Sequence, residues 1–369
     1  HGKYYEGYTR QLVYEELHDG ARIVRTYCWP YRGNVTWKRL ANYGSFMVSA
    51  HWGARRLSEI DVLYVYHPPL TISLPAVTIG KTKKVPFIYD VEDIWPEAGV
   101  AADAVQPGAL YRLMSRWAQW AYAHASHITV LAPPFADLLV HQGVPADKIS
   151  VMPNWADDSI YRPVSGEATR AQLGLADSDF VVMVAGNMGS THGVEVILDA
   201  ANRLRDHSDI VFLMVGTGPE VDKLIQQSQQ LGLSRVRFLG YQEPSTMPYL
   251  LAAADLLVVH LKRSPAGAVS LPSRIPAYMA CARPILVAAE GAPRQIIEQT
   301  GCGFTCDPED HDALTDAILY ASSDRARLDL MGRLGREAYL AHYSENSVVA
   351  RLVDLVHAIG DKDASGNPR

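Results

Sequence analysis

Short apolar runs alternate with amphipathic stretches along the whole chain. The runs 180–185 and 210–215 are apolar at every position, which is typical of strands buried on both faces of a parallel sheet. The stretches between the runs have the periodicity of helices. We therefore predict an α/β fold with helices on both faces of parallel sheets. The predicted strands are 22–27, 62–66, 87–89, 127–131, 149–152, 180–185, 210–215, 235–239, 256–260 and 284–287. The predicted helices are 37–57, 110–123, 134–142, 193–206, 219–231, 244–253, 275–281, 292–300, 310–321 and 344–359.

The same pattern occurs twice, and a polar, proline-containing break at 153–166 separates the two sets. A chain of 369 residues also exceeds the size at which one hydrophobic core usually keeps growing. We predict two Rossmann-like, doubly wound domains, residues 1–163 and 164–343, that face each other across a cleft. The C-terminal ends of the strands should open into this cleft, where such sheets bind ligands. A last helix, 344–359, precedes a polar tail, 360–369, that we expect to be disordered.

Composition narrows the class of protein. A content of 48% apolar and 20% charged residues is that of an ordinary globular protein. The net charge of −6 argues against a broad nucleic-acid-binding surface. No apolar run approaches the roughly 18 residues of a membrane-spanning helix. The four cysteines are Cys28, Cys281, Cys302 and Cys306. They lack the second Cys or His pair that a zinc site needs, so we expect buried thiols in a reducing cytosol.

A glycine-rich turn follows the predicted strand 180–185. It runs from Gly186 to Gly193, contains Asn187, Gly189 and His192, and leads into a predicted helix. Glycines allow a backbone to approach a ligand closely, and free N–H groups at the start of a helix favour an anion. The turn has neither the dinucleotide fingerprint nor the Lys-Ser/Thr of a P-loop. It is either a phosphate-binding turn or a plain tight connection.

Two further segments favour the phosphate interpretation. Gly216 and Gly218 form a second glycine turn directly after strand 210–215. Ser273 can cap a short helix, and Arg274 stands in the first turn of that helix. A cation there opposes the helix dipole, which is reasonable if a diphosphate needs a bidentate donor at this point. The alternative is a solvated surface arginine.

Three carboxylates follow the strand 87–89 in the first half, namely Asp90, Glu92 and Asp93, with Trp95 beside them. They are expected to face the cleft. There they could bind sugar hydroxyls, stabilise positive charge at an anomeric carbon or hold a metal. The alternative is a role in capping and turns, and we prefer that interpretation for Asp90.

Two features give weaker signals. His67 ends another strand that faces the same cleft, although a loop histidine is more often structural than catalytic. The helix 37–57 mixes apolar and aromatic side chains with basic residues near both ends. Such a helix can lie on an anionic membrane surface. A core-facing helix with basic ends explains the pattern nearly as well.

In combination these segments resemble glycosyltransferase family 4, which has the GT-B fold. The resemblance is greatest to the bacterial branch that builds O-antigen, capsule and exopolysaccharide repeat units and includes amino-sugar transferases. It extends from about residue 3 to about residue 359. The segments that carry it are 186–193, 272–274, 278–280 and 93–97, with weaker matches at 151–154, 238–241 and 253–255.

The resemblance implies a retaining transfer from a nucleotide-sugar, without a metal or other cofactor. Asp93 would lie close to the donor sugar, and Arg274 would stabilise the leaving nucleotide; both are therefore candidate catalytic residues. Glu92, Trp95 and His67 are candidates for the sugar and acceptor side. The implied donor-binding residues are Gly186, Asn187, Gly189, His192, Gly193, Gly216, Gly218, Tyr241, Ser273, Arg274 and Tyr278.

The branch resemblance favours UDP over GDP and suggests an N-acetylated amino sugar. The expected acceptor is a polyprenyl-linked sugar or an oligosaccharide. We expect a cytoplasmic protein at the inner face of a bacterial membrane, which the helix 37–57 could contact. The final helix of this fold typically crosses back to the first domain.

Three departures from the family pattern limit these implications. The family's opening strand and glycine-rich acceptor-side loop precede anything present here; the chain begins at His1 without a methionine, so we expect a fragment whose first sheet lacks a strand. Many members carry a ribose-binding Glu where this chain has Ala277. The first glycine turn offers Asn187 and His192 in place of basic residues, which leaves Arg274 as the main phosphate cation. A catalytically weak nucleotide-sugar-binding partner subunit and a GT-B nucleotide-sugar epimerase remain alternatives.

Overall fold

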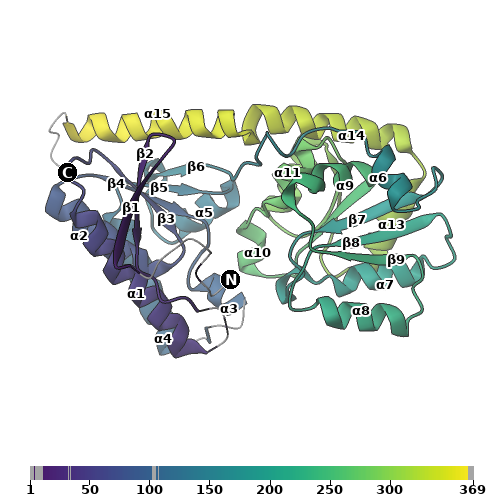
Figure 1. The fold of residues 1–369 in the computed structure, drawn as a ribbon, viewed down its shortest axis with the longest axis horizontal. Coiled ribbons are helices and arrows are strands. Elements are labelled where there is room, and N and C mark those ends of the chain that lie inside the picture. Colours follow the sequence, from purple (N-terminus) through teal and green to yellow (C-terminus); the bar gives the residue numbers. More distant parts are fainter. Residues whose placement is uncertain are drawn as a thin grey trace.

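The computed structural model describes residues 4, 11–31, 33, 35–101, 105–106 and 108–364. Figure 1 shows two α/β lobes side by side, with the C-terminal helices along one edge of both. The predicted α/β architecture with parallel sheets is therefore confirmed. Within the described part of the chain, no helix is both long enough and apolar enough to cross a membrane.

The second lobe is built on a six-stranded sheet of order β12-β11-β10-β7-β8-β9, and all its strand pairs are parallel. Every residue of β7 and β8 is buried, as their apolar sequences predict. The strand order reverses between β7 and β10. The strands are β7 (Phe180–Ala185), β8 (Ile210–Val215), β9 (Val236–Gly240), β10 (Leu256–His260), β11 (Ile285–Ala288) and β12 (Gly303–Cys306).

Helices cover both faces of this sheet. The sequence pattern did not predict β12, α6, α10 or α14; β12 is short and half-buried, α6 and α10 are short, and α14 has many charged residues. The helices are α6 (Glu167–Gln172), α7 (Glu195–Arg203), α8 (Val221–Gln230), α9 (Met247–Ala253), α10 (Pro265–Val269), α11 (Arg274–Ala280), α12 (Ala292–Thr300), α13 (His311–Ser322) and α14 (Arg325–Ala338).

The first lobe has a four-stranded parallel sheet whose strands follow in chain order, with β3 at one edge. The sequence analysis did not predict α2 or the short α3. The strands are β3 (Leu63–His67), β4 (Phe87–Val91), β5 (His127–Val130) and β6 (Ile149–Val151). The helices are α1 (Thr36–Arg55), α2 (Ser73–Lys83), α3 (Glu97–Ala101), α4 (Ala109–His124) and α5 (Pro133–His141).

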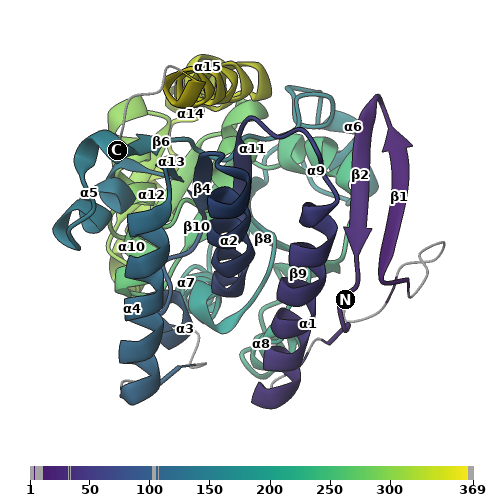
Figure 2. The same cartoon turned by 90° about the vertical axis from the view of Figure 1, so that its left-hand side faces the viewer.

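The predicted strand 22–27 does not join this sheet. It corresponds to β2 (Ala21–Thr26), which pairs antiparallel with β1 (Val13–His18) in a separate ribbon (Figure 2). The two-residue turn Asp19-Gly20 has positive φ at both positions, the geometry for which Asp-Gly is the strongest local hairpin signal. The tight turn favours antiparallel pairing of β2 with β1 over pairing with the parallel sheet.

The chain crosses between the lobes twice, and the two crossings touch. The hydroxyl of Tyr339 lies 2.8 Å from both Ala156 O and Asp158 Oδ1, and Ala156 forms a β-bridge with Ser344. Helix α15 (Glu345–Ala364) then runs back along the first lobe (Figure 1).

The expected disorder of 360–369 is wrong for its first half. Residues 360–364 are helical, because α15 still packs on the first lobe there: Ile359 is buried, and a Cβ at Gly360 would touch Val62. The rest of the expected tail, 365–369, lies outside the described residues.

A partly buried ion network fixes the end of the second sheet that is remote from its strand C-termini. Asp255 Oδ2 accepts hydrogen bonds from the Val181 N–H at 2.7 Å and from Arg170 Nη1 at 3.2 Å. Asp255 Oδ1 accepts a third from Arg325 Nη1 at 3.1 Å. The side chains of Asp255 and Arg170 are only 16% and 15% exposed. One carboxylate thus connects β7, α6 and α14.

Replacing this carboxylate should destabilise the second lobe. Asp255→Ala leaves the Val181 N–H without its acceptor and removes the carboxylate partner of the partly buried Arg170, so we expect the free energy of unfolding to fall by about 2–4 kcal/mol. The matched control is Asp312→Ala, whose 77% exposed side chain pairs with Arg203 and should cost less than about 1 kcal/mol. Urea unfolding of both variants measures the difference, and equal losses would contradict this role of Asp255.

Candidate functional site

A cavity of about 460 Å³ opens at the C-terminal ends of β7 and β8. Both glycine turns, the start of α11 and the linker between the lobes contribute to it. It therefore lies beside the point at which the strand order of the second sheet reverses, the usual ligand position in such sheets. Seven of the predicted donor-binding residues line it: Gly186, Asn187, Gly216, Tyr241, Ser273, Arg274 and Tyr278.

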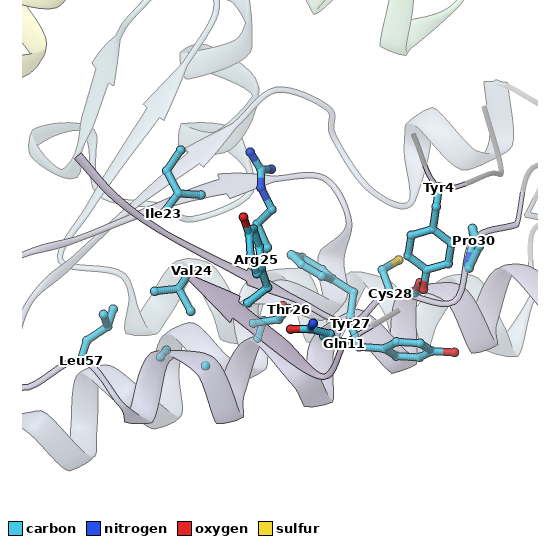
Figure 3. Close-up of a pocket in the computed structure, with 15 residues that line it drawn as sticks. Tyr4, Gln11, Ile23, Val24, Arg25, Thr26, Tyr27, Cys28, Pro30 and Leu57 are labelled. Carbon is cyan, nitrogen blue, oxygen red and sulfur yellow. The ribbon is translucent and has the colours of Figure 1, made fainter. Parts of the chain in front are cut away.

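A larger cavity, of about 760 Å³, lies in the first lobe between β2 and α1 (Figure 3). Among the described residues that line it, Arg25 is the one charged side chain. Arg25 already donates a hydrogen bond to Glu16. The smaller cavity is the better candidate, because it lies at the C-terminal ends of the strands, where such sheets bind ligands.

The two glycine turns touch each other through their backbones. Gly186 N–H donates to Val215 O, and Met188 N–H donates to Thr217 O, both at 2.9 Å. A Cβ at Gly216 would lie 2.0 Å from Gly186 O, and φ at Gly216 is +128°. A side chain at this position would separate the turns. Gly216 therefore lets the two turns meet and form one wall of the cavity.

Four predicted donor-binding residues do not line the cavity. Gly218 is needed for packing, since a Cβ there would lie 2.3 Å from Met188 O. Gly189, His192 and Gly193 form the outer part of the first turn. His192 is half-buried there, and burial together with the nearby Arg274 lowers the pKa of His192 to about 4. The imidazole is therefore neutral at pH 7.

Sequence reasoning missed the histidine that supports the first turn. His260 ends β10, and its Nε2 accepts the Glu309 N–H at 3.0 Å, which leaves the ring proton on Nδ1. That Nδ1 donates to His192 O at 2.7 Å. A Cβ at Gly193 would lie 2.6 Å from this ring. The available signal was a polar residue at the end of an otherwise apolar strand.

Arg274 places a positive charge against the first turn. Its Cζ would lie 3.5 Å from a Cβ at Gly186. Burial lowers the pKa of the Arg274 guanidinium, and within the described ranges no carboxylate shifts it back. A charge that is removed from water without a counter-ion is costly. The arrangement therefore favours an anion in the cavity.

Tyr278 supports the site from below. Its buried hydroxyl accepts a hydrogen bond from Ala185 N–H at 3.1 Å and donates one to Ala185 O at 3.0 Å. These bonds fix α11 to the end of β7. The predicted ribose position, Ala277, also lines the cavity and offers no hydrogen-bonding side chain.

The linker contributes cavity residues that the sequence analysis did not assign. Trp155, Asp157 and Tyr161 line the cavity together with Tyr241. Trp155 and Tyr241 are both exposed, at 40% and 63%. Two accessible aromatic side chains thus border the same opening, where a planar ring could stack.

The acidic cluster of the first lobe divides into different roles. Asp90 lies within β4 and accepts a hydrogen bond from Thr129 of β5 at 2.6 Å, which is a structural role but not the cap or turn that we preferred for it. Glu92 accepts one from Asn154 at 2.8 Å, and burial, with Asp90 nearby, raises the pKa of Glu92 to about 7. Asp93 is exposed, yet its surroundings still raise the pKa of its carboxyl by desolvation. Asp93 is therefore the accessible carboxylate of this cluster.

The first-lobe candidates are not brought into the cavity itself. Neither Asp93, Glu92, Trp95 nor His67 lines it. His67 is 1% exposed and stands 5.4 Å from the ring of Tyr89, and burial lowers its pKa to about 3. Among the residues that the structure describes, no group of three His, Cys, Asp or Glu side chains could hold a metal ion.

Two family models match the chain. The model for glycosyl transferases group 1 matches residues 165–340, and the glycosyl transferase 4-like domain matches residues 4–155. The putative colanic acid biosynthesis glycosyl transferase WcaI of Escherichia coli is 27% identical over 78% of this chain and 72% of its own length. The probable glycosyltransferase WbjE of Pseudomonas aeruginosa is 28% identical over 70% of this chain and 65% of its own length.

The fold is that of a solved relative. HepE of Anabaena, crystallised in complex with UDP, superposes with a TM-score of 0.70 at 20% identity, over 88% of this chain and 84% of its own. The matched regions together include both lobes and all of the glycine turns. The chain belongs to glycosyltransferase family 4 and is a glycosyltransferase with the GT-B fold.

Proposed function

We propose that the chain transfers a sugar from a UDP-sugar to a lipid-linked or saccharide acceptor in bacterial surface-polysaccharide synthesis. The observation that carries this proposal is Arg274, a cation without a carboxylate partner among the described residues, beside two glycine turns at the cavity wall. The name of WcaI refers to colanic acid biosynthesis, and HepE has been crystallised with UDP and with UDP-glucose. Both support this choice of donor and pathway class. We further propose an N-acetylated amino sugar as the transferred sugar, because the sequence resembles the branch of the family that includes amino-sugar transferases.

The donor would lie with its diphosphate between the first glycine turn and Arg274. The uracil and ribose would extend toward Gly216 and Tyr241, where Trp155 stands on the linker side of the opening. As the bond between the anomeric carbon and the phosphate breaks, negative charge grows on the diphosphate. A fixed guanidinium stabilises that charge more in the transition state than in the ground state. Arg274 would supply this charge without a metal ion or cofactor.

The acceptor would approach from the first lobe. Asp93 is the exposed carboxylate at the end of β4, and a carboxylate near the anomeric carbon stabilises the positive charge that develops there. His192 does not line the cavity, and its Nδ1 is buried without a protein partner in the described ranges. We propose retention of the anomeric configuration on the family resemblance.

Two alternatives predict different products. A binding partner subunit would bind UDP-sugars yet release no UDP from them when an acceptor is supplied. An epimerase would change the sugar without any acceptor. Incubation with UDP-sugars, with and without polyprenyl-linked acceptors, followed by chromatography of nucleotide and sugar, separates all three outcomes.

Removing the phosphate cation should abolish diphosphate-dependent binding. Arg274→Ala removes a charge-assisted hydrogen-bond donor, so UDP affinity should fall by about 10- to 100-fold while uridine affinity changes little. Titration calorimetry measures both. Arg203→Ala, an exposed arginine of the same lobe, is the control and should bind UDP normally. If Arg274→Ala binds UDP as the parent does, the phosphate assignment is wrong.

Neutralising the accessible carboxylate should separate binding from transfer. Asp93→Asn keeps the size of the side chain and removes the charge, so we expect UDP affinity within about twofold of the parent and transfer reduced by about 100-fold or more. Calorimetry and UDP release measure the two quantities. Asp137→Asn, on the exposed surface of α5, should change neither. An unchanged rate in Asp93→Asn would exclude Asp93 from catalysis.

The raised pKa of Glu92 makes a pH-dependent contribution to stability. The folded protein binds the Glu92 proton up to about pH 7, whereas an unfolded Glu releases it near pH 4.3. Glu92 therefore destabilises the fold as the pH rises through this interval. Glu92→Gln should raise the melting temperature more at pH 8 than at pH 5. Glu243→Gln, at an exposed position, should show no such difference, and a pH-independent effect of Glu92→Gln would contradict the assignment.

A further inference from the structure

His260, at the end of β10, is a polar residue that connects two distant segments of the second lobe. It is only 3% exposed. Its Nε2 accepts the Glu309 N–H at 3.0 Å, and its Nδ1 donates to His192 O at 2.7 Å. Burial lowers the pKa of His260, so the ring is neutral at pH 7 and carries one proton. Because the Glu309 N–H can only donate, that proton lies on Nδ1, and the ring is fixed as a donor to the first glycine turn.

The acceptor of this bond belongs to the peptide group between His192 and Gly193. A trans peptide directs its C=O and its N–H to opposite sides. Because His192 O faces β10, the Gly193 N–H faces the other way. Within the described part of the chain this N–H has no backbone acceptor, and it lies two residues before the start of α7. It is therefore a donor that a ligand can use.

Gly193 and His260 fit each other sterically. A Cβ at Gly193 would lie 2.6 Å from Cε1 of the ring, and φ at Gly193 is +55°. The absence of a side chain leaves room for the imidazole beside this peptide. A larger residue at position 193 would displace the ring, and the bond to His192 O would be lost.

A second contact from the end of β10 holds the same part of the turn. The Lys262 N–H donates to Thr191 O at 2.9 Å, and within the turn the His192 N–H donates to Gly189 O at 3.0 Å. The outer half of the first turn is thus held by β10, whereas its inner half is held by the second turn. Burial and the charge of Arg274 both lower the pKa of His192, which places the guanidinium near this outer half.

We propose that His260 is a positioning residue for the donor diphosphate: its Nδ1–H orients the 192–193 peptide so that the Gly193 N–H and the start of α7 face the phosphate next to the sugar. Free N–H groups and the positive dipole at the start of a helix favour an anion. Fixed dipoles of this kind stabilise growing negative charge without rearranging during the reaction. Gly193 does not line the 460 Å³ cavity, so its N–H would meet the part of the diphosphate that extends beyond the cavity. The inference rests on the proposed function, since it assumes a nucleotide-sugar donor.

Two amide variants separate the two ends of the His260 ring. His260→Asn keeps a donor near the place of Nδ1, whereas His260→Gln keeps an acceptor near the place of Nε2. We expect the UDP affinity of His260→Asn to stay within about threefold of the parent, and that of His260→Gln and His260→Leu to fall about tenfold or more. UMP lacks the outer phosphate, so its affinity should change by less than about twofold in all three variants. Titration calorimetry measures both ligands.

The control removes the hydrogen bond of another buried histidine. His127 of β5 is 8% exposed, and its Nε2 lies 2.8 Å from Ser150 Oγ. His127→Leu should lower the melting temperature and leave UDP affinity unchanged. Thermal melting also identifies variants that fail to fold, and the comparison of His260→Asn with His260→Gln decides if His260→Leu is one of them.

These measurements concern binding, so they decide on His260 whether or not the parent transfers a sugar. Equal losses of UDP affinity in His260→Asn and His260→Gln would overturn the inference, and so would parallel losses for UDP and UMP or parent-like UDP binding by His260→Leu. Any of these patterns in a chain that transfers sugar would overturn the inference alone. A parent that does not bind UDP would overturn it together with the proposed donor.

Discussion

The direct contact between the backbones of the two glycine turns is the constraint on which the proposed donor cavity depends. Gly216 meets Gly186 O so closely that any side chain would separate the turns. The hydrogen bonds from Gly186 and Met188 to the second turn then fix one continuous wall. Arg274 rests against that wall, and Tyr278 fixes the helix that carries it to the end of β7. Arg274, the proposed phosphate cation, is therefore held by elements whose own positions follow from a close backbone contact.

The residues that join the lobes also border the cavity. Trp155 and Asp157 line it, while Ala156 between them bonds to Tyr339 and bridges to Ser344. A change in the angle between the lobes must move the backbone at these few residues, because both connections between the lobes meet there. The linker side of the cavity would move with such a change. The orientation of the lobes therefore affects the shape of the cavity directly, through the linker residues that line it.

Sequence reasoning succeeded where chemistry is local and failed where it depends on contact. The buried strands such as β7 and the glycine turns are visible as apolar runs and glycine pairs, and the Asp19-Gly20 hairpin could have been predicted by the same kind of signal. The structural role of Gly218 and the support from His260 could not, because each depends on a neighbour far away in the chain. The first-lobe carboxylates illustrate the same limit. Their order along the chain gives no indication that Asp90 accepts a hydrogen bond from Thr129 while Asp93 stays accessible.

The short segment before Arg274 connects the contact between the lobes to the candidate site. Helix α10 belongs to the second lobe by sequence, yet it contacts α3 and α5 of the first, and Val269 packs against the first-lobe core. On its other side α10 is fixed to its own lobe, since a Cβ at Gly291 would lie 1.9 Å from Ala268 O. Only four residues separate Val269 from Arg274. The contact that holds the lobes together and the cation that would hold the donor therefore share one short stretch of chain, and separating the lobes must disturb the segment that presents Arg274.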